Sequence, residues 1–184
     1  MMALIILLAV IGLVVVGFIA IYNRLVRNRN MVREGWSGID VQLKRRADLI
    51  PNLIETVKGY MIHERELLTR VTELRSRSMR AQDIGERTRA EGELSRTLAN
   101  LFAVAENYPA LKANQNFLEL QRQIADIEEQ IQFSRRYYNG TVRNYNTMIE
   151  SFPSNIVARI FNFIQADYFE IGEEADRAVP RVRF

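Results

Sequence analysis

The sequence predicts an all-α protein, with an N-terminal transmembrane helix followed by an antiparallel bundle of three long helices and a short fourth. Three observations support this fold class. Residues 1–23 are apolar without a charged side chain, apolar residues recur at sevenfold spacing through most of the remaining chain, and no internal Pro/Gly-rich linker divides it. We therefore expect a transmembrane anchor at 1–23, a helical bundle domain at 24–169 and an acidic, loosely ordered tail at 170–184.

The composition excludes several classes of function. The 184 residues include no cysteine and a single histidine, His63, so thiolate zinc sites, multi-histidine metal sites and cysteine nucleophiles are excluded. The formal net charge is +3, and the arginines between residues 65 and 96 alternate with acidic side chains, which cancels most of the field that a phosphate backbone would feel. We expect no metal, no cofactor and no nucleic-acid partner.

The apolar segment at 3–22 predicts an uncleaved membrane anchor. A helix of this length crosses about 30 Å of hydrocarbon. A secretory signal peptide is disfavoured, because a basic n-region and a small-x-small cleavage site are lacking. Positive charge follows the span at Arg24, Arg27, Arg29 and Arg33. The positive-inside tendency then predicts the N-terminus outside and the bundle in the cytoplasm, and lipid-headgroup contacts at these arginines are an alternative role.

A second heptad pattern predicts one long helix at about 30–78. The pattern has two seams, that is, rows of apolar residues at sevenfold spacing. The first consists of Trp36, Leu43, Ile50, Val57 and Val71, and the second of Val32, Ile39, Leu53, Tyr60, Leu67 and Leu74. Pro51 either kinks this helix or marks a new helix capped by Asp48, and the unaltered register favours the kink. Arg46 and Glu64 fall on core-type positions, where a charge is costly unless it is paired or lies at the solvated edge of the bundle.

The next two helices follow from a polar turn and a proline. Residues 76–85 are expected to turn the chain into a helix at about 86–107, which ends before Pro109. A central helix then begins near Pro109, where proline is acceptable in a first turn, and runs to Phe152. Its seams are Phe117, Ile124, Ile131, Tyr138, Tyr145 and Phe152, and Leu120, Ile127 and Met148. No alternating β-branched run competes with it, and Asn139-Gly140 is interpreted as helix because the heptad pattern passes through it.

A short apolar helix is expected after Phe152-Pro153-Ser154-Asn155. Its apolar residues are Ile156, Ile160, Phe161, Phe163, Ile164 and Tyr168. We expect this helix to dock on the bundle and close it. Binding to a membrane surface or to a partner is the alternative.

Catalytic motifs are not evident in the sequence. There is no G-x-S-x-G motif, P-loop or dinucleotide fingerprint, and His63-Glu64 lacks the second histidine of H-E-x-x-H. Glu128 and Glu129 are assigned to a solvated helix face. We therefore expect that the protein is not an enzyme.

Several longer motifs occur in one order along the chain. They are Asn28-Arg29-Asn30, residues 36–46 (WSGIDVQLKRR), 48–53 (DLIPNL), 57–60 (VKGY) and 108–114 (YPALKAN), Tyr138-Asn139, Tyr145-Asn146 and Phe152-Pro153-Ser154-Asn155. Together they resemble the LemA family of bacterial membrane proteins. The resemblance covers nearly the whole chain and implies one N-terminal membrane helix followed by an α-helical bundle. Gly35 and Ala47 depart from the alanine and histidine often associated with the family at these positions. The resemblance implies no established activity, cofactor or binding residue.

These observations favour a noncatalytic, membrane-anchored helical scaffold in the bacterial inner membrane. The predicted helix at 30–78 is much longer than the returning helix at 86–107, so an apolar stripe near the membrane is left uncovered. The stripe consists of Trp36, Ile39, Leu43 and Ile50. Either a kink at Pro51 folds it back or neighbouring copies cover it, and we favour a homo-oligomer packed along it. Other membrane proteins are further possible partners. The alternative function is a membrane-surface or small-ligand binding module that uses the juxtamembrane arginines or the bundle.

Overall fold

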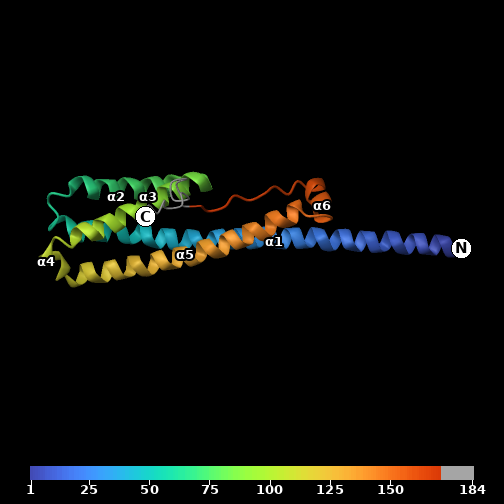
Figure 1. The fold of residues 1–184 in the computed structure, drawn as a ribbon, viewed down its shortest axis with the longest axis horizontal. Coiled ribbons are helices and arrows are strands. Elements are labelled where there is room, and N and C mark those ends of the chain that lie inside the picture. Colours follow the sequence, from blue (N-terminus) through green and yellow to red (C-terminus); the bar gives the residue numbers. More distant parts are fainter. Residues whose placement is uncertain (171–184) are drawn as a thin grey trace, which may run out of the picture. The chain divides into compact units, whose positions relative to one another are not determined.

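The structure, a computed structural model, describes residues 1–170. Every regular element in that range is a helix, which confirms the all-α class. The helices are α1 (Met2–Lys58), α2 (Arg65–Arg80), α3 (Ile84–Ala105), α4 (Pro109–Lys112), α5 (Gln115–Glu150) and α6 (Ser154–Ile160) (Figure 1). The predicted acidic tail lies, from residue 171 on, outside the described residues.

The chain divides into two compact units. Among the described residues, unit 1 comprises 1–38 and 134–168, and unit 2 comprises 39–133 and 169–170. The boundaries lie within α1 and α5, so these two helices contribute to both units. The division therefore differs from the predicted single bundle domain at 24–169.

Unit 2 is a bundle of four antiparallel segments, the end of α1, α2, α3 and the start of α5, which alternate in direction (Figure 1). Each segment places apolar residues on one stripe at helical spacing, and burial of these stripes forms the core. The core residues are Ile50, Leu53, Val57, Met61, Leu68, Val71, Leu74, Leu94, Leu98, Leu101, Ala105, Leu111, Phe117 and Ile124. The short helix α4 contributes Leu111.

The prediction of one long helix at 30–78 is wrong for its second half, which forms a separate helix. α1 ends at Lys58, the chain turns at residues 59–64, and α2 then runs back as a separate helix. Within the turn, the amides of Tyr60 and Met61 donate to the carbonyl of Val57, at 3.0 and 2.9 Å. The fully buried Met61 side chain anchors the turn in the core.

α1 continues without a break through Pro51, so a new helix capped by Asp48 does not form. Pro51 is exposed, and it leaves the carbonyl of Ala47, four residues earlier, without its usual helical donor. That carbonyl accepts a hydrogen bond of 2.6 Å from Nε of Arg75 on α2.

The prediction that the stripe at Trp36, Ile39, Leu43 and Ile50 is left uncovered is wrong. Ile39, Leu43 and Ile50 are at most 2% exposed, and Trp36 is half-buried. The reason is the early turn at 59–64, because α2 and α3 both return along α1, as the contacts of Arg75 with Ala47 and of Arg87 with Asp40 show. Trp36 packs on Tyr138 of α5. The stripe offers no free apolar surface for self-association, and the oligomeric state stays a prediction without this support.

The later helices agree more closely with the sequence. The predicted turn at 76–85 is shorter, since α2 reaches Arg80 and the Asp83 side chain caps α3 by accepting from the amide of Glu86 at 2.7 Å. α3 confirms the helix expected at 86–107. α5 starts at Gln115 rather than at Pro109, and it runs through Asn139-Gly140 as expected. On the predicted seam that starts at Phe117, all residues are buried except Phe152, which lies beyond α5 and is 80% exposed. On the second seam Ile127 is buried, and Leu120 and Met148 are half-buried.

In unit 1, α1 approaches α5 closely at Gly35. A β-carbon at this position would lie 3.2 Å from the Cα atom of Tyr138, so the small residue is needed for the contact as it stands. The ring of Trp36 lies 5.7 Å from that of Tyr138, centroid to centroid.

Unit 1 also contains α6, which ends at a left-handed residue. Asn162 has φ 52°, its amide donates to the carbonyl of Arg159, and the amide of Phe163 donates to that of Ala158. This is the Schellman arrangement, in which the residue after the left-handed position packs inward. Phe163 is accordingly buried.

Candidate membrane-proximal site

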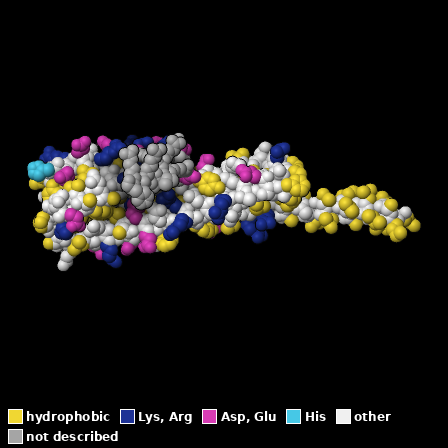
Figure 2. All heavy atoms as spheres, in the orientation of Figure 1, with side chains coloured by type: hydrophobic (Ala, Val, Ile, Leu, Met, Phe, Trp, Pro, Cys, Tyr) yellow, Lys and Arg dark blue, Asp and Glu magenta, His cyan; other side chains and the backbone are white. Residues whose placement is uncertain are grey.

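The N-terminal part of α1 is long and apolar enough to cross a membrane, and none of its most apolar 18-residue window is buried. Figure 2 shows hydrophobic side chains covering this part of the helix. Such a surface is unfavourable in water and favourable in lipid. Length, composition and exposure thus support an anchor at the predicted position, 1–23, although the same properties are found in signal sequences.

The four juxtamembrane arginines do not form one patch. At about 100° per residue, Arg24 and Arg27 project on one side of α1, and Arg29 and Arg33 project on the nearly opposite side. Arg24, Arg27 and Arg33 are exposed, and Arg29 is half-buried. The positive charge therefore surrounds the helix just after the apolar segment.

Two of these arginines contact other parts of unit 1. The guanidinium of Arg29 lies 5.0 Å from the centre of the Phe163 ring, a cation–π contact. Arg24 lies at a surface pocket of about 450 Å³. The residues that line it are Arg24, Asn28, Arg143, Asn144, Thr147 and Met148. Two guanidinium groups at one pocket favour an anionic ligand.

The chain after α6 is held on α5 by hydrogen bonds from two side chains, Asn146 and Tyr138. The Asn146 amide group donates to the carbonyl of Ala166 and accepts from its N–H, both at 2.9 Å. The Tyr138 hydroxyl donates to the carbonyl of Asp167 at 2.8 Å. These contacts fix the segment that connects α6 to residue 168. Burial, with a smaller contribution from the charge of Asp167, raises the pKa of Tyr138 to about 12.

Unit 2 contains a buried ionic network around Arg46. Its guanidinium is 1% exposed and forms ion pairs with Glu91 and Glu128, and it donates to the Ser95 hydroxyl at 2.7 Å. Ser78 donates to the other carboxylate oxygen of Glu91. Burial lowers the pKa of the Arg46 guanidinium, and the charge and hydrogen bond of Glu91 oppose this shift. The arginine stays charged, so the network is a structural ion cluster.

This network decides between the alternatives left open by the sequence. Arg46 is buried and paired, whereas Glu64 is half-buried and accepts a hydrogen bond of 3.2 Å from the Tyr108 hydroxyl. Glu128 is not on a solvated face, because its side chain is 28% exposed and paired, whereas Glu129 is exposed. Glu91 was missed, although it lies seven residues after Ile84 and seven before Leu98, and so on a core seam.

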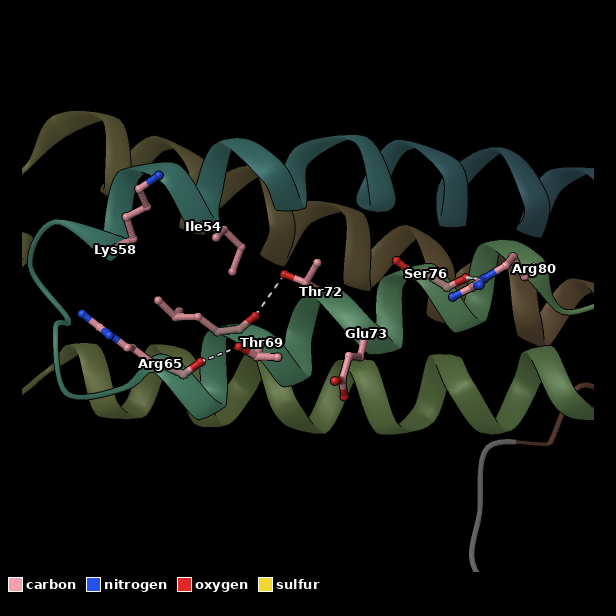
Figure 3. Close-up of a pocket in the computed structure, with 9 residues that line it drawn as sticks. Ile54, Lys58, Arg65, Thr69, Thr72, Glu73, Ser76 and Arg80 are labelled. Atoms are coloured by element: carbon pink, nitrogen blue, oxygen red, sulfur yellow. Dashed lines mark hydrogen bonds between the residues drawn. The ribbon is translucent and has the colours of Figure 1, made fainter.

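The surface of unit 2 has a pocket of about 490 Å³ beside α2 (Figure 3). Lys58, Arg65 and Arg80 lie around it, and Ile54 and Leu68 provide apolar surface. The hydroxyls of Thr69 and Thr72 donate to carbonyls of their own helix, at 2.8 and 3.0 Å, as the dashed lines in Figure 3 show. The pocket therefore has scattered cationic groups and no preorganised set of reactive side chains. Among residues 1–170, no group of three His, Asp or Glu side chains is placed to hold a metal ion.

The model of the LemA family matches residues 35–184. No curated protein matches the chain.

Proposed function

We propose that this chain, which belongs to the LemA family, is a noncatalytic, membrane-anchored helical scaffold of the bacterial cell membrane. The observation that carries the proposal is the continuity of α1. One helix, Met2–Lys58, contains both the exposed apolar segment and part of the core of the bundle, with no linker between them. Such an arrangement suits a protein that presents a folded body at a membrane, because the same helix supplies residues to the anchor and to the body.

The proposed partners are the lipid bilayer, other membrane proteins and further copies of the chain. The orientation with the body in the cytoplasm is part of the proposal, and it is supported by the arginines that follow the apolar segment. Self-association would have to use the outer surface of the units, since the stripe at Trp36, Ile39, Leu43 and Ile50 is largely buried within the chain.

The scaffold proposal can be tested by the mass of the assembly in mild detergent. The full chain has a mass of 21.4 kDa. Light scattering after size exclusion, corrected for detergent, should give a protein mass well above this value, and photo-crosslinkers at Arg45 or Met79, both exposed, should join the chain to the same partner. A monomer without crosslinks in intact cells would contradict the proposal.

A second candidate function is binding of an anionic lipid headgroup at the pocket that Arg24 and Arg143 line. Native mass spectrometry of the full chain, purified with phosphatidylglycerol, provides the test. Arg24→Gln with Arg143→Gln should lose the retained lipid, and the matched variant Arg27→Gln with Arg136→Gln should keep it, because these exposed arginines are not among the residues that line the pocket. Equal retention in both variants would contradict a specific headgroup site.

A further inference from the structure

One face of α6 is buried, and the other face is apolar but exposed. Val157 and Ala158 are buried within unit 1, whereas the opposite side of the helix is exposed. We call the exposed residues of this segment the α6 apolar surface. They are Phe152, Ile156, Ile160, Phe161 and Ile164, and their exposed fractions run from 47% to 80%. Figure 2 shows hydrophobic side chains gathered where α6 lies in Figure 1.

A cluster of this kind is unusual on a protein surface that faces water. Single exposed apolar residues are common, but contiguous apolar patches mark contacts with a partner or with lipid. The only charged side chain within α6 is Arg159, which is exposed and lies three residues after Ile156, so these two side chains are neighbours on the helix surface. A face of apolar side chains with a basic residue is typical of helices that lie in a membrane interface.

The position of the α6 apolar surface along α1 indicates what covers this surface. The Phe161 ring lies 4.7 Å from that of Tyr22 and 6.0 Å from that of Phe18, centroid to centroid. Phe18 and Tyr22 belong to the last turns of the apolar segment, which needs almost all of its 20 or so residues to cross the hydrocarbon. A side chain in contact with both must lie at the depth that they occupy.

We propose that the α6 apolar surface is a second membrane contact, which inserts into the interfacial layer of the bilayer on the side of the bundle. Phe161 reaches the boundary of the acyl chains beside Phe18 and Tyr22, and Arg159 extends to the lipid phosphates. Arg29 lies over Phe163 on the inner side of the segment and carries positive charge at the same level. The proposal rests on the membrane anchor of the proposed function.

This surface corrects the role expected for the short helix. A docking helix that closes the bundle would bury its large apolar residues, but here only Phe163 is buried among them, whereas Ile156, Ile160, Phe161 and Ile164 are exposed. The hydrogen bonds of Asn146 and Tyr138 fix the segment after α6 on α5, so that the surface is presented beside the anchor and not on a free tail.

Depth-dependent quenching of tryptophan fluorescence tests the proposal in the full chain. Trp36 is the only tryptophan, so Trp36→Phe provides a background into which Phe161→Trp or Phe18→Trp is introduced. The proteins are reconstituted in vesicles of phosphatidylcholine and phosphatidylglycerol that carry bromine near the top or near the end of the acyl chain. Phe161→Trp should be quenched several-fold more strongly by the shallow bromine, whereas native Trp36, about 21 Å along α1 from Tyr22, should not be quenched.

The outcomes separate the two proposals. Quenching of Phe18→Trp without quenching of Phe161→Trp would leave the anchor in place and overturn the second membrane contact, since the apolar surface would then face a protein or water. Absence of quenching at both positions would overturn the anchor and, with it, the inference.

A charge variant gives an independent test. Ile160→Glu with Ile164→Glu should abolish the shallow quenching of Phe161→Trp, because both side chains are exposed and become costly to insert. The matched control is Val41→Glu with Phe133→Glu in unit 2, where the replaced residues are exposed to a similar degree. Unchanged quenching in the Ile160 and Ile164 variant, with the same helix content by circular dichroism, would overturn the inference.

Discussion

Nε of Arg75 donates a hydrogen bond of 2.6 Å to the carbonyl of Ala47, the group that Pro51 leaves without its usual donor. A proline inside a helix has no N–H for the carbonyl four residues earlier. In unit 2 a side chain from α2 supplies the missing donor to α1. The proline therefore interrupts the hydrogen-bonding pattern of α1 without ending the helix, and the compensation also links the two helices of the hairpin.

Removal of this compensation should destabilise unit 2 more when Pro51 is present than when it is replaced. Arg75→Met leaves the half-buried carbonyl unpaired, and we expect it to lower the free energy of unfolding by about 1–3 kcal/mol. In a Pro51→Ala background the new N–H can satisfy Ala47, so the same substitution should cost clearly less. Urea unfolding followed by circular dichroism measures this double-mutant cycle. Equal costs in both backgrounds would show that the hydrogen bond to Ala47 is not the source of the effect.

Alkaline pH should destabilise unit 1 through Tyr138. Because its pKa is raised to about 12, first by burial and then by Asp167, folding favours the neutral phenol. This contribution is fully present below the ordinary tyrosine pKa of about 10 and is lost as the pH rises from there to about 12. Trp36, whose ring lies 5.7 Å from Tyr138, reports the change by fluorescence.

The control for the pH prediction is a pair of phenylalanine variants. Tyr138→Phe cannot ionise, so it should lose most of the pH dependence between about 10 and 12, while it also loses the hydrogen bond to Asp167. Tyr137→Phe, at an exposed position, should behave like the native chain. Identical pH profiles for all three proteins would contradict the assignment.

The helix class and most of the buried seams could be predicted from the sequence, because heptad spacing directly reports a buried stripe. The hairpin at 59–64 could not. Val57 and Val71 lie on the same seam fourteen residues apart, and both face the core of unit 2 from different helices, so the sevenfold pattern survives the turn. The only sequence feature in this turn that indicates a break in the helix is Gly59, and a single glycine is tolerated inside a helix.

The polar contacts within the two units could not be predicted from the sequence, for a different reason. Arg46, Glu91 and Glu128 are far apart in the sequence, and each is an isolated charge until the fold brings them together. Asn146 belongs to a motif of the resemblance, but its partner Ala166 offers only backbone groups, which carry no sequence signal. The apolar character of α6 could be read from the sequence. Which of its residues are exposed could not, because that depends on the position of α6 beside Tyr22.

Arg46 should be required for the stability of unit 2. Arg46→Met leaves the carboxylate of Glu91, which is 2% exposed, without its cation, and we expect a loss of about 3–5 kcal/mol. The combined variant Arg46→Met with Glu91→Leu and Glu128→Gln should recover much of this loss, because no buried charge remains. Thermal unfolding by circular dichroism gives the comparison, with the exposed Arg45→Met as control. A single variant as stable as the native chain would mean that Glu91 finds solvent or another partner.

Ile131 should contribute strongly to the packing of α5. Its side chain is 2% exposed, as its place on the central seam predicts, and Ile131→Ala should cost about 2–5 kcal/mol. Phe133→Ala, two residues away at a position 50% exposed, is the matched control and should cost much less. Unfolding curves that rank the two variants the other way would indicate that the opposite face of α5 is packed.

The proposed topology predicts where a single cysteine reacts. The native sequence has none, so Gln82→Cys, in the exposed turn between α2 and α3, and Met2→Cys, at the exposed start of α1, each provide one thiol. The arginines after the apolar segment are costly to translocate, and we therefore expect the turn to stay in the cytoplasm and the N-terminus to emerge outside. A membrane-impermeant maleimide should then label Met2→Cys in intact cells and Gln82→Cys only after permeabilisation. Labelling of Gln82→Cys in intact cells, with Met2→Cys protected, would invert the orientation and place the α6 apolar surface at the outer leaflet.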